Sequence, residues 1–126
     1  MKAVLDASAI LAFLHREPGW EAVQPIIGDG CISAVNWCEV AQKIAEKDLD
    51  VSQVRRLLAD LGLVIEPFSP EQAESAASLW AHTRNLGLSL ADRACLALAM
   101  DKGLPAMTAD RAWAAVKLDV EIEVIR

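Results

Sequence analysis

Short apolar runs alternate with helical patterns along almost the whole chain. Each run is long enough only for a short strand, and the segment before the next run is long enough for a helix. Strands that are joined through helices pair in parallel, because a parallel connection must cross the sheet. The alternation therefore predicts an α/β fold with a short, mainly parallel central sheet of about four or five strands flanked by helices. The predicted strands are Lys2–Leu5, Cys31–Ser33, Leu63–Glu66, Ala106–Thr108 and Val120–Ile125.

The predicted helices differ in how many of their faces are apolar. Ser89–Lys102 is apolar on nearly every face, so we expect it to be buried. Val51–Leu61 has one apolar face and is followed by a glycine, which is a common helix stop. Pro70–Leu86 begins with a proline and acidic residues in its first turn. Pro25 interrupts one of them, Trp20–Ile27. The complete set is Ser8–Arg16, Trp20–Ile27, Val35–Lys47, Val51–Leu61, Pro70–Leu86 and Ser89–Lys102.

Length and charge limit the classes of protein to consider. The 126 residues predict a single domain over residues 1–126, and the 54% hydrophobic content is enough for a sizeable core. The 12 basic and 18 acidic side chains give a formal net charge of −6. This charge argues against a nucleic-acid binder that works through a basic surface. It is compatible with an enzyme that meets phosphates through bound metal ions.

Cysteine usage and hydropathy indicate the compartment. Cys31, Cys38 and Cys95 are odd in number and share no spacing typical of metal ligands, so they indicate free thiols in a reducing cytosol. The first apolar stretch is interrupted by Asp6, which makes it a poor signal peptide. No apolar run reaches the roughly 18 residues that a membrane span needs. We therefore expect a cytoplasmic protein with no membrane partner.

Two of the predicted strands end at or near an aspartate. Asp6 follows the run AVL at the start of the chain, and Asp110 follows AMT near its end. In α/β sheets, ligands bind beyond the carboxyl ends of the strands, where the strand order reverses. Taken singly, either aspartate is also explained as the cap of the helix that follows it.

Two further acids lie near the starts of predicted helices. Glu39 lies in the apolar context AVNWCEVA, on one helical stripe with Asn36 and Lys43, and could pair with Lys43 on a solvated face. Asp92 stands three residues after Ser89, which is the spacing of a capping box. The helix that begins near Asp92 is expected to be buried. A carboxylate at the start of a buried helix needs a hydrogen-bond donor or a positive charge as its partner. Both interpretations stay open for each acid.

Considered together, the four acids indicate a metal site. The right-handed winding of an α/β fold can bring all of them to one end of the sheet. Carboxylates about 4 Å apart repel by roughly 4 kcal/mol per pair at an effective dielectric constant near 20. Such a cluster is tolerated only if some acids are protonated or if cations neutralise them. Hard divalent ions that prefer oxygen ligands, Mg²⁺ or Mn²⁺, suit this chemistry.

Four segments of the sequence resemble the motifs of PIN-domain ribonucleases, specifically the VapC-type toxins of toxin–antitoxin pairs. The segments are VLDASAILAFL, ISAVNWCEV, TRNLGLSLADRACLALA and GLPAMTADRAW, and they stand in the family's order over essentially the whole chain. The resemblance implies a PIN-like three-layer fold. It also implies a metal-dependent endoribonuclease that hydrolyses phosphodiester bonds in structured or single-stranded RNA, leaving a 5′-phosphate and a 3′-hydroxyl.

The resemblance also implies which residues form the site. In the family, a quartet of acids binds one or two divalent ions, and a nearby hydroxyl and a small polar residue support them. Ala112 stands where some relatives carry a further acid, so the number of ions stays open. The implied metal-binding and catalytic acids are Asp6, Glu39, Asp92 and Asp110, and the implied supporting residues are Ser8 and Thr108.

Partners follow from the same resemblance. VapC-type toxins are usually homodimers held inactive by a small antitoxin, whose tail lies along an apolar groove and often sends a basic side chain to the acids. The four tryptophans could stack on RNA bases, but their apolar surroundings favour packing in the core or at an interface. Arg93 could contact phosphate or pair with an acid. Candidates for the groove are Leu11, Leu14, Trp20 and the apolar face of Val51–Leu61.

Three other classes of protein share some of these sequence features. A response-regulator receiver needs an acidic pair after its first strand and a late lysine, but Asp6 stands alone and the final segment EIEVIR has no lysine. A phosphatase of the D-x-D type is disfavoured because Ser8 occupies the second position. A catalytically idle PIN domain that serves as a binding module is the remaining alternative, and the presence of all four acids argues against it.

Overall fold

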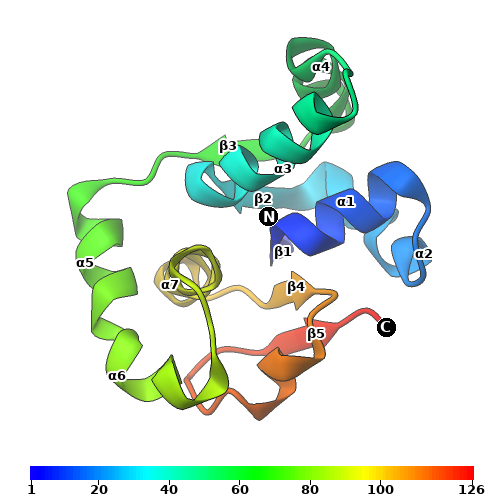
Figure 1. Ribbon diagram of the computed structural model, residues 1–126. Helices are drawn as coiled ribbons and strands as arrows, with labels where there is room; N and C mark the ends of the chain where they lie inside the picture. Colours follow the sequence, from blue (N-terminus) through cyan, green and yellow to red (C-terminus); the bar gives the residue numbers. More distant parts are fainter.

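The computed structural model describes residues 1–126 as a five-stranded sheet between layers of helices (Figure 1). The strand order is β3-β2-β1-β4-β5, and every neighbouring pair is parallel. The predicted α/β fold with a parallel central sheet is therefore confirmed. The strands are β1 (Ala3–Leu5), β2 (Gly30–Ser33), β3 (Val64–Glu66), β4 (Ala106–Thr108) and β5 (Ile122–Val124).

Strand order reverses at β1, the central strand. The chain moves outward from β1 through β2 to β3, and then returns to the other side of β1 to add β4 and β5. Val4 pairs with Ala106 of β4 on one side and with Cys31 of β2 on the other. The carboxyl ends of β1 and β4 thus meet at a topological switch point, which is where open α/β sheets bind ligands.

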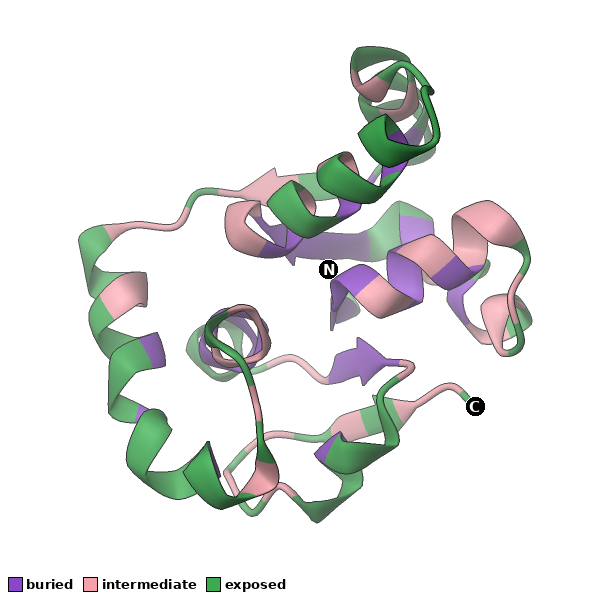
Figure 2. Cartoon of the chain, in the orientation of Figure 1, coloured by how far each residue is buried: buried purple, intermediate pink, exposed green.

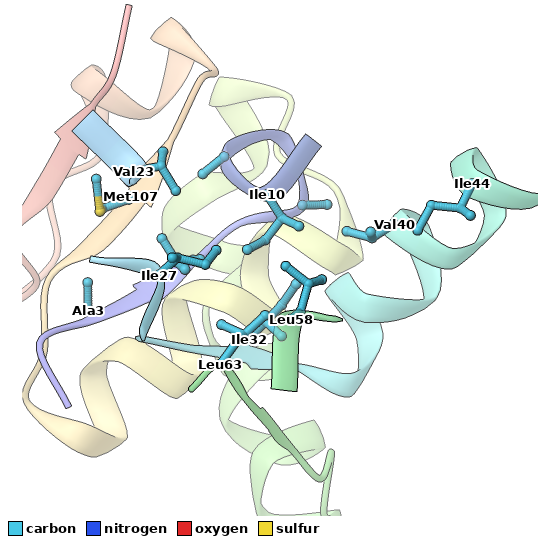
Figure 3. Packing of buried hydrophobic residues seen from close by; sticks show 13 residues of the cluster. Ala3, Ile10, Val23, Ile27, Ile32, Val40, Ile44, Leu58, Leu63 and Met107 are labelled. Atoms are coloured by element: carbon cyan, nitrogen blue, oxygen red, sulfur yellow. The ribbon is translucent and has the colours of Figure 1, made fainter. Parts of the chain in front are cut away.

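Each face of the sheet is covered by its own hydrophobic cluster. Because side chains alternate across a strand, Leu5 faces one cluster and Val4 the other. Figure 3 shows Ile10, Val40 and Leu58 converging from three helices in the first cluster. These helices are α1 (Ala7–His15), α3 (Ala34–Glu46) and α4 (Val51–Leu61).

The second cluster forms around α7 (Leu90–Lys102), whose residues Ala94 to Ala99 are all buried. Figure 2 shows this helix buried among the other elements, whereas α5 and α6 expose most of their surface. The predicted burial of this helix is confirmed. Trp113, from the 3-10 turn η3 (Arg111–Ala115), is fully buried in the same cluster.

The prediction of one helix over Pro70–Leu86 is wrong. The segment forms α5 (Pro70–Ser78), α6 (Trp80–Thr83) and the 3-10 turn η2 (Arg84–Leu86). The Leu79 N–H group donates to Ala76, three residues back, so the helix tightens there. The Thr83 hydroxyl then donates to the Leu79 carbonyl at 2.9 Å, and this competes with regular helix bonding.

The segment Trp20–Ile27 is interrupted near Pro25, as the sequence predicts. It forms α2 (Trp20–Val23) and, beyond Pro25, the 3-10 turn η1 (Ile27–Asp29). The ring of Pro25 lacks the N–H group that would continue the helix. None of the helices is long and apolar enough to cross a membrane.

Candidate active site

Four carboxylates line one pocket of about 260 Å³ at the carboxyl end of the sheet. They come from four separate parts of the chain: Asp6 after β1, Glu39 on α3, Asp92 in the first turn of α7, and Asp110 after β4. The structure therefore brings together all four acids that the sequence singled out. The remaining lining residues are Ala7, Ser8, Leu11 and Lys43.

Asp6 is the most buried of the four acids, with 5% of its surface exposed. It occupies the N-cap position of α1, but its side chain accepts no hydrogen bond from that helix. Instead, one oxygen, Oδ2, accepts from the Ser8 hydroxyl at 2.7 Å and from the Thr108 hydroxyl at 3.0 Å. Capping therefore does not explain Asp6, and its carboxylate belongs to a polar network inside the pocket.

The two hydroxyls connect the ends of β1 and β4. While Ser8 donates to Asp6, its oxygen accepts from the Ala109 N–H group at 2.9 Å. While Thr108 donates to Asp6, its oxygen accepts from the Asp110 N–H group at 3.1 Å. Each hydroxyl thus uses its single proton on the carboxylate and is itself oriented by the backbone.

Asp92 and Asp110 both act as caps. Asp92 forms the predicted capping box with Ser89: its Oδ2 accepts from the Ser89 N–H group at 2.9 Å, and the Ser89 hydroxyl accepts in return. Oδ1 of Asp110 accepts from the Ala112 N–H group at 2.9 Å. The capping prediction is correct for both residues, and both also line the pocket. A cap engages one oxygen, so capping and ligand binding are compatible here.

Glu39 is more exposed, and it does not form the ion pair with Lys43 that was one of its two open interpretations. Lys43 forms an ion pair with Glu46 instead, at 3.6 Å. Glu39 receives a long contact of 3.4 Å from the amide Nδ2 of Asn36, one helical turn earlier. Lys43 still lines the pocket and brings a positive charge to its rim.

The electrostatics of the pocket disfavour carboxylate charge. Burial raises the pKa of Asp6 from its ordinary 3.8 to about 6; donation by Ser8 and Thr108 opposes the shift, whereas the charges of Asp92 and Glu39 add to it. Burial also raises the pKa of Glu39, and Asp92 contributes to this rise. Burial and mutual repulsion of the acids therefore make negative charge in this pocket unfavourable unless a cation offsets it.

Residues 3–118 match the family model of the PIN domain. The chain belongs to the PIN-domain family. The resemblance found in the sequence is thereby confirmed at the level of the family. No curated protein sequence matches the chain.

Several solved structures are similar to this PIN domain, and among them are a toxin and a toxin–antitoxin complex. A toxin–antitoxin complex from Klebsiella pneumoniae is 21% identical with a TM-score of 0.74, over 96% of this chain and 100% of the other. VapC20 of Mycobacterium tuberculosis, a toxin that cleaves the sarcin–ricin loop, is 17% identical with a TM-score of 0.70, over 95% and 99%. FitAcB of Neisseria gonorrhoeae is 21% identical with a TM-score of 0.68, over 95% of each chain. At these identities the similarity establishes a shared fold.

The donor chemistry of the pocket in this PIN domain suits a hard divalent cation. Its acidic ligands are carboxylate oxygens, which Mg²⁺ and Mn²⁺ prefer, and no thiol or imidazole lines it. The structure contains no group of three or more His, Cys, Asp or Glu side chains placed closely enough to hold a metal ion directly. Mg²⁺ commonly keeps several waters and binds through one or two carboxylates, so the open pocket fits that mode of binding.

Other residues of the PIN domain differ from the sequence-based expectations. Arg93 pairs with no acid; its guanidinium donates to the Ala76 carbonyl at 3.3 Å. Trp113 lies in the core as expected, whereas Trp80 is exposed and Trp20 lies beneath the Arg16 guanidinium at 4.2 Å. Sequence reasoning placed Asn36 on the stripe of Glu39 but gave it no role, although a buried amide in an apolar helix is a signal for a polar network.

A larger cavity of about 490 Å³ lies away from the acids, between the end of α7 and the segment that precedes β5. Five of its nine lining residues are hydrophobic, and its charged residues are Asp119 and Glu121. The carboxylate pocket is smaller but is the one at the switch point of the sheet. We therefore regard the carboxylate pocket as the candidate active site.

Proposed function

We propose that this PIN domain is a divalent-metal-dependent endoribonuclease that acts as the toxin of a toxin–antitoxin pair. The observation that supports the proposal most is the shared pocket of Asp6, Glu39, Asp92 and Asp110. Membership of the PIN-domain family and the similarity to toxin structures support it further. Hydrolysis of a phosphodiester is the reaction that such a set of oxygen ligands suits best.

In this proposal, the four acids hold one or two Mg²⁺ or Mn²⁺ ions. When bound, the metal would shield the scissile phosphate from the carboxylates, lower the pKa of a water molecule and stabilise the leaving oxygen. The buried position of Asp6 and its raised pKa fit this role, because a cation removes the unfavourable charge that burial creates.

The protein's own groups orient the site. Ser8, in the first turn of α1, and Thr108, at the end of β4, fix the Asp6 carboxylate from two parts of the chain, so its position does not depend on the ion. The capping interactions of Asp92 and Asp110 hold those two carboxylates at the starts of α7 and η3. Lys43 at the rim supplies a positive charge that can contact an RNA phosphate next to the one that is cut.

The acidic chain indicates selective cleavage. With a net charge of −6, few phosphates meet Lys or Arg, so affinity for bulk RNA is modest. Selectivity then comes from RNA shape and from single-stranded loops whose bases are accessible. One structural neighbour is a toxin that cleaves the sarcin–ricin loop, and we propose a structured RNA of that kind as the substrate class.

The proposed partners are a small antitoxin and a second copy of the chain. Leu57 and Leu61 of α4 have 58% and 52% of their surface exposed, whereas Leu58 is buried. The exposed apolar part of α4 supports its place in an antitoxin groove, together with Leu11, Leu14 and Trp20. Several structural neighbours are toxin–antitoxin complexes, which supports a partner of this class.

The experiment is cleavage of a structured RNA by purified protein with Mg²⁺ or Mn²⁺, compared with the same reaction in chelator. The control is Asp6→Ala purified identically, with circular dichroism to establish that it is folded. We expect cleavage only by the wild-type protein with metal. Equal cleavage by the variant would identify a contaminating nuclease, and an inactive wild type that still binds RNA would favour the idle binding module.

A further inference from the structure

Asn36 is a fully buried amide at the centre of the acidic network. Its Nδ2 group lies 2.9 Å from the Ala91 carbonyl oxygen, 3.4 Å from Asp6 Oδ1 and 3.4 Å from Glu39 Oε1. Its two amide protons therefore face three acceptors from three different elements. Ala91 directly precedes Asp92, so the same amide reaches the backbone beside a third acid of the pocket.

The surroundings fix the orientation of this amide. Turning it over would place Oδ1 against a carbonyl and two carboxylates, which are all acceptors. In the orientation observed, Oδ1 is buried without a hydrogen-bond partner. A buried acceptor without a partner is unfavourable for folding. An apolar residue at this helix position would remove the unpaired oxygen but would also take a donor from the Ala91 carbonyl, Asp6 and Glu39. The amide is therefore explained by the acceptors that it contacts and not by the packing of α3.

We propose that Asn36 is a positioning residue that sets the separation of Asp6, Glu39 and Asp92. This inference rests on the metal-dependent function proposed above and assigns it a further residue. The amide joins α3 to the first turn of α7 and to the carboxylate after β1, and these elements carry the three acids. Asn36 makes the only side-chain hydrogen bonds that connect α3, the helix of Glu39, to Asp6 and to the start of α7.

The chemistry of an amide suits this position. A lysine or arginine would also attract the carboxylates, but its positive charge would neutralise them and compete with a metal ion. An aspartate would add a further negative charge to a pocket that already destabilises its acids. The asparagine donates protons without adding charge, so it draws the acids together and leaves their negative charge for a cation.

The test compares Asn36→Ala with Ile44→Val, a control on the same helix. Ile44 is also buried but packs in the hydrophobic cluster and contacts none of the acids by hydrogen bond. Mn²⁺ affinity of each intact protein is measured by calorimetry, and kcat and KM are measured on one structured RNA. We expect Asn36→Ala to weaken Mn²⁺ binding about 10- to 100-fold and to lower kcat with little change in KM, as loss of an outer-shell partner does at metal sites. Ile44→Val should change neither quantity by more than about twofold.

Two results would overturn the inference. Wild-type Mn²⁺ affinity in folded Asn36→Ala would overturn it while the proposed function stands. Absence of Mn²⁺ binding by the wild-type protein would overturn both. If Asn36→Ala does not fold, Asn36→Ser is measured instead, because its shorter side chain fills part of the space but cannot span to Ala91; unchanged Mn²⁺ affinity in that variant counts against the inference in the same way.

Discussion

Ser8 and Thr108 both donate to the same oxygen of Asp6, although they lie 100 positions apart in the chain. Ser8 belongs to the first turn of α1, and Thr108 ends β4. The two hydroxyls therefore hold the Asp6 carboxylate between neighbouring strands of the sheet, and their removal should affect stability and activity together.

Thr108→Val should lower activity and stability, because it removes one donor from a buried carboxylate while keeping the shape of the side chain. A hydrogen bond to a charged group contributes about 1.5 to 3 kcal/mol, so we expect a loss of that order at pH 7.5. Urea unfolding in chelator measures it. Ser8→Ala should act through the same oxygen, so the double variant should deviate from additivity. Strict additivity would contradict a shared network.

The stability of the metal-free protein should fall as pH rises. The pKa of Asp6 is about 6 in the folded protein and lower in the unfolded chain, so the folded state binds more protons between pH 4 and 6. Stability from this group is present below its unfolded pKa and is lost as pH rises through 6, by at most about 3 kcal/mol. Asp6→Asn should reduce this slope, as urea unfolding at pH 4.5 and 7.5 in chelator would measure. An equal slope in the variant would assign the dependence to other groups.

Mn²⁺ should stabilise the folded protein against heat. An ion that binds only the native state at 100 times its Kd contributes about 2.7 kcal/mol, which corresponds to a rise in Tm of roughly 5 to 15 °C for a domain of this size. Asp92→Asn should reduce this rise, whereas Asp101→Asn, on the same helix and outside the pocket, should not. A rise that is equal in both variants would indicate non-specific binding.

Lys43→Ala should raise KM for RNA more than it lowers kcat, because Lys43 lies at the rim of the carboxylate pocket. Losing one phosphate contact should also lower the slope of log affinity against log salt by about 1. Binding can be measured in an Asp6→Asn background that does not cut. The matched control is Lys117→Ala, because Lys117 is exposed and lies outside the pocket. An equal effect of both substitutions would contradict a specific phosphate contact by Lys43.

The sequence predicted the sheet and the shared location of the acids because both depend on patterns that extend over the whole chain. Strand–helix alternation determines a parallel sheet, and acids after β1 and β4 meet because those strands are neighbours. Local hydrogen bonds were predicted less well. The prediction of helix capping was correct for Asp92 and Asp110 but wrong for Asp6. The Asp6 carboxylate accepts from the Thr108 hydroxyl, which is distant in sequence, instead of from the backbone of its own helix.

The features that could not be predicted depend on tertiary contacts. The break at Leu79 depends on burial of that residue and on the Thr83 hydroxyl, and neither interrupts the helical pattern of the sequence. The three contacts of Asn36 require α3 and α7 to lie side by side, which periodicity along one helix does not reveal. The roles of the acids in metal binding and catalysis stay predictions for the experiments above.

The strand order of this sheet also determines when the pocket can form during synthesis. Asp6 is among the first residues to leave the ribosome, but its partner Thr108 follows 102 residues later. A nascent chain that stops before β4 lacks Thr108 and Asp110, so it cannot complete the carboxylate pocket whatever else has folded. Contacts of such large sequence separation form late, because loop closure must precede them. Translation of nearly the whole chain therefore precedes assembly of the pocket, and a chain terminated before β4 lacks both Asp110 of that pocket and the Thr108 hydroxyl that donates to Asp6.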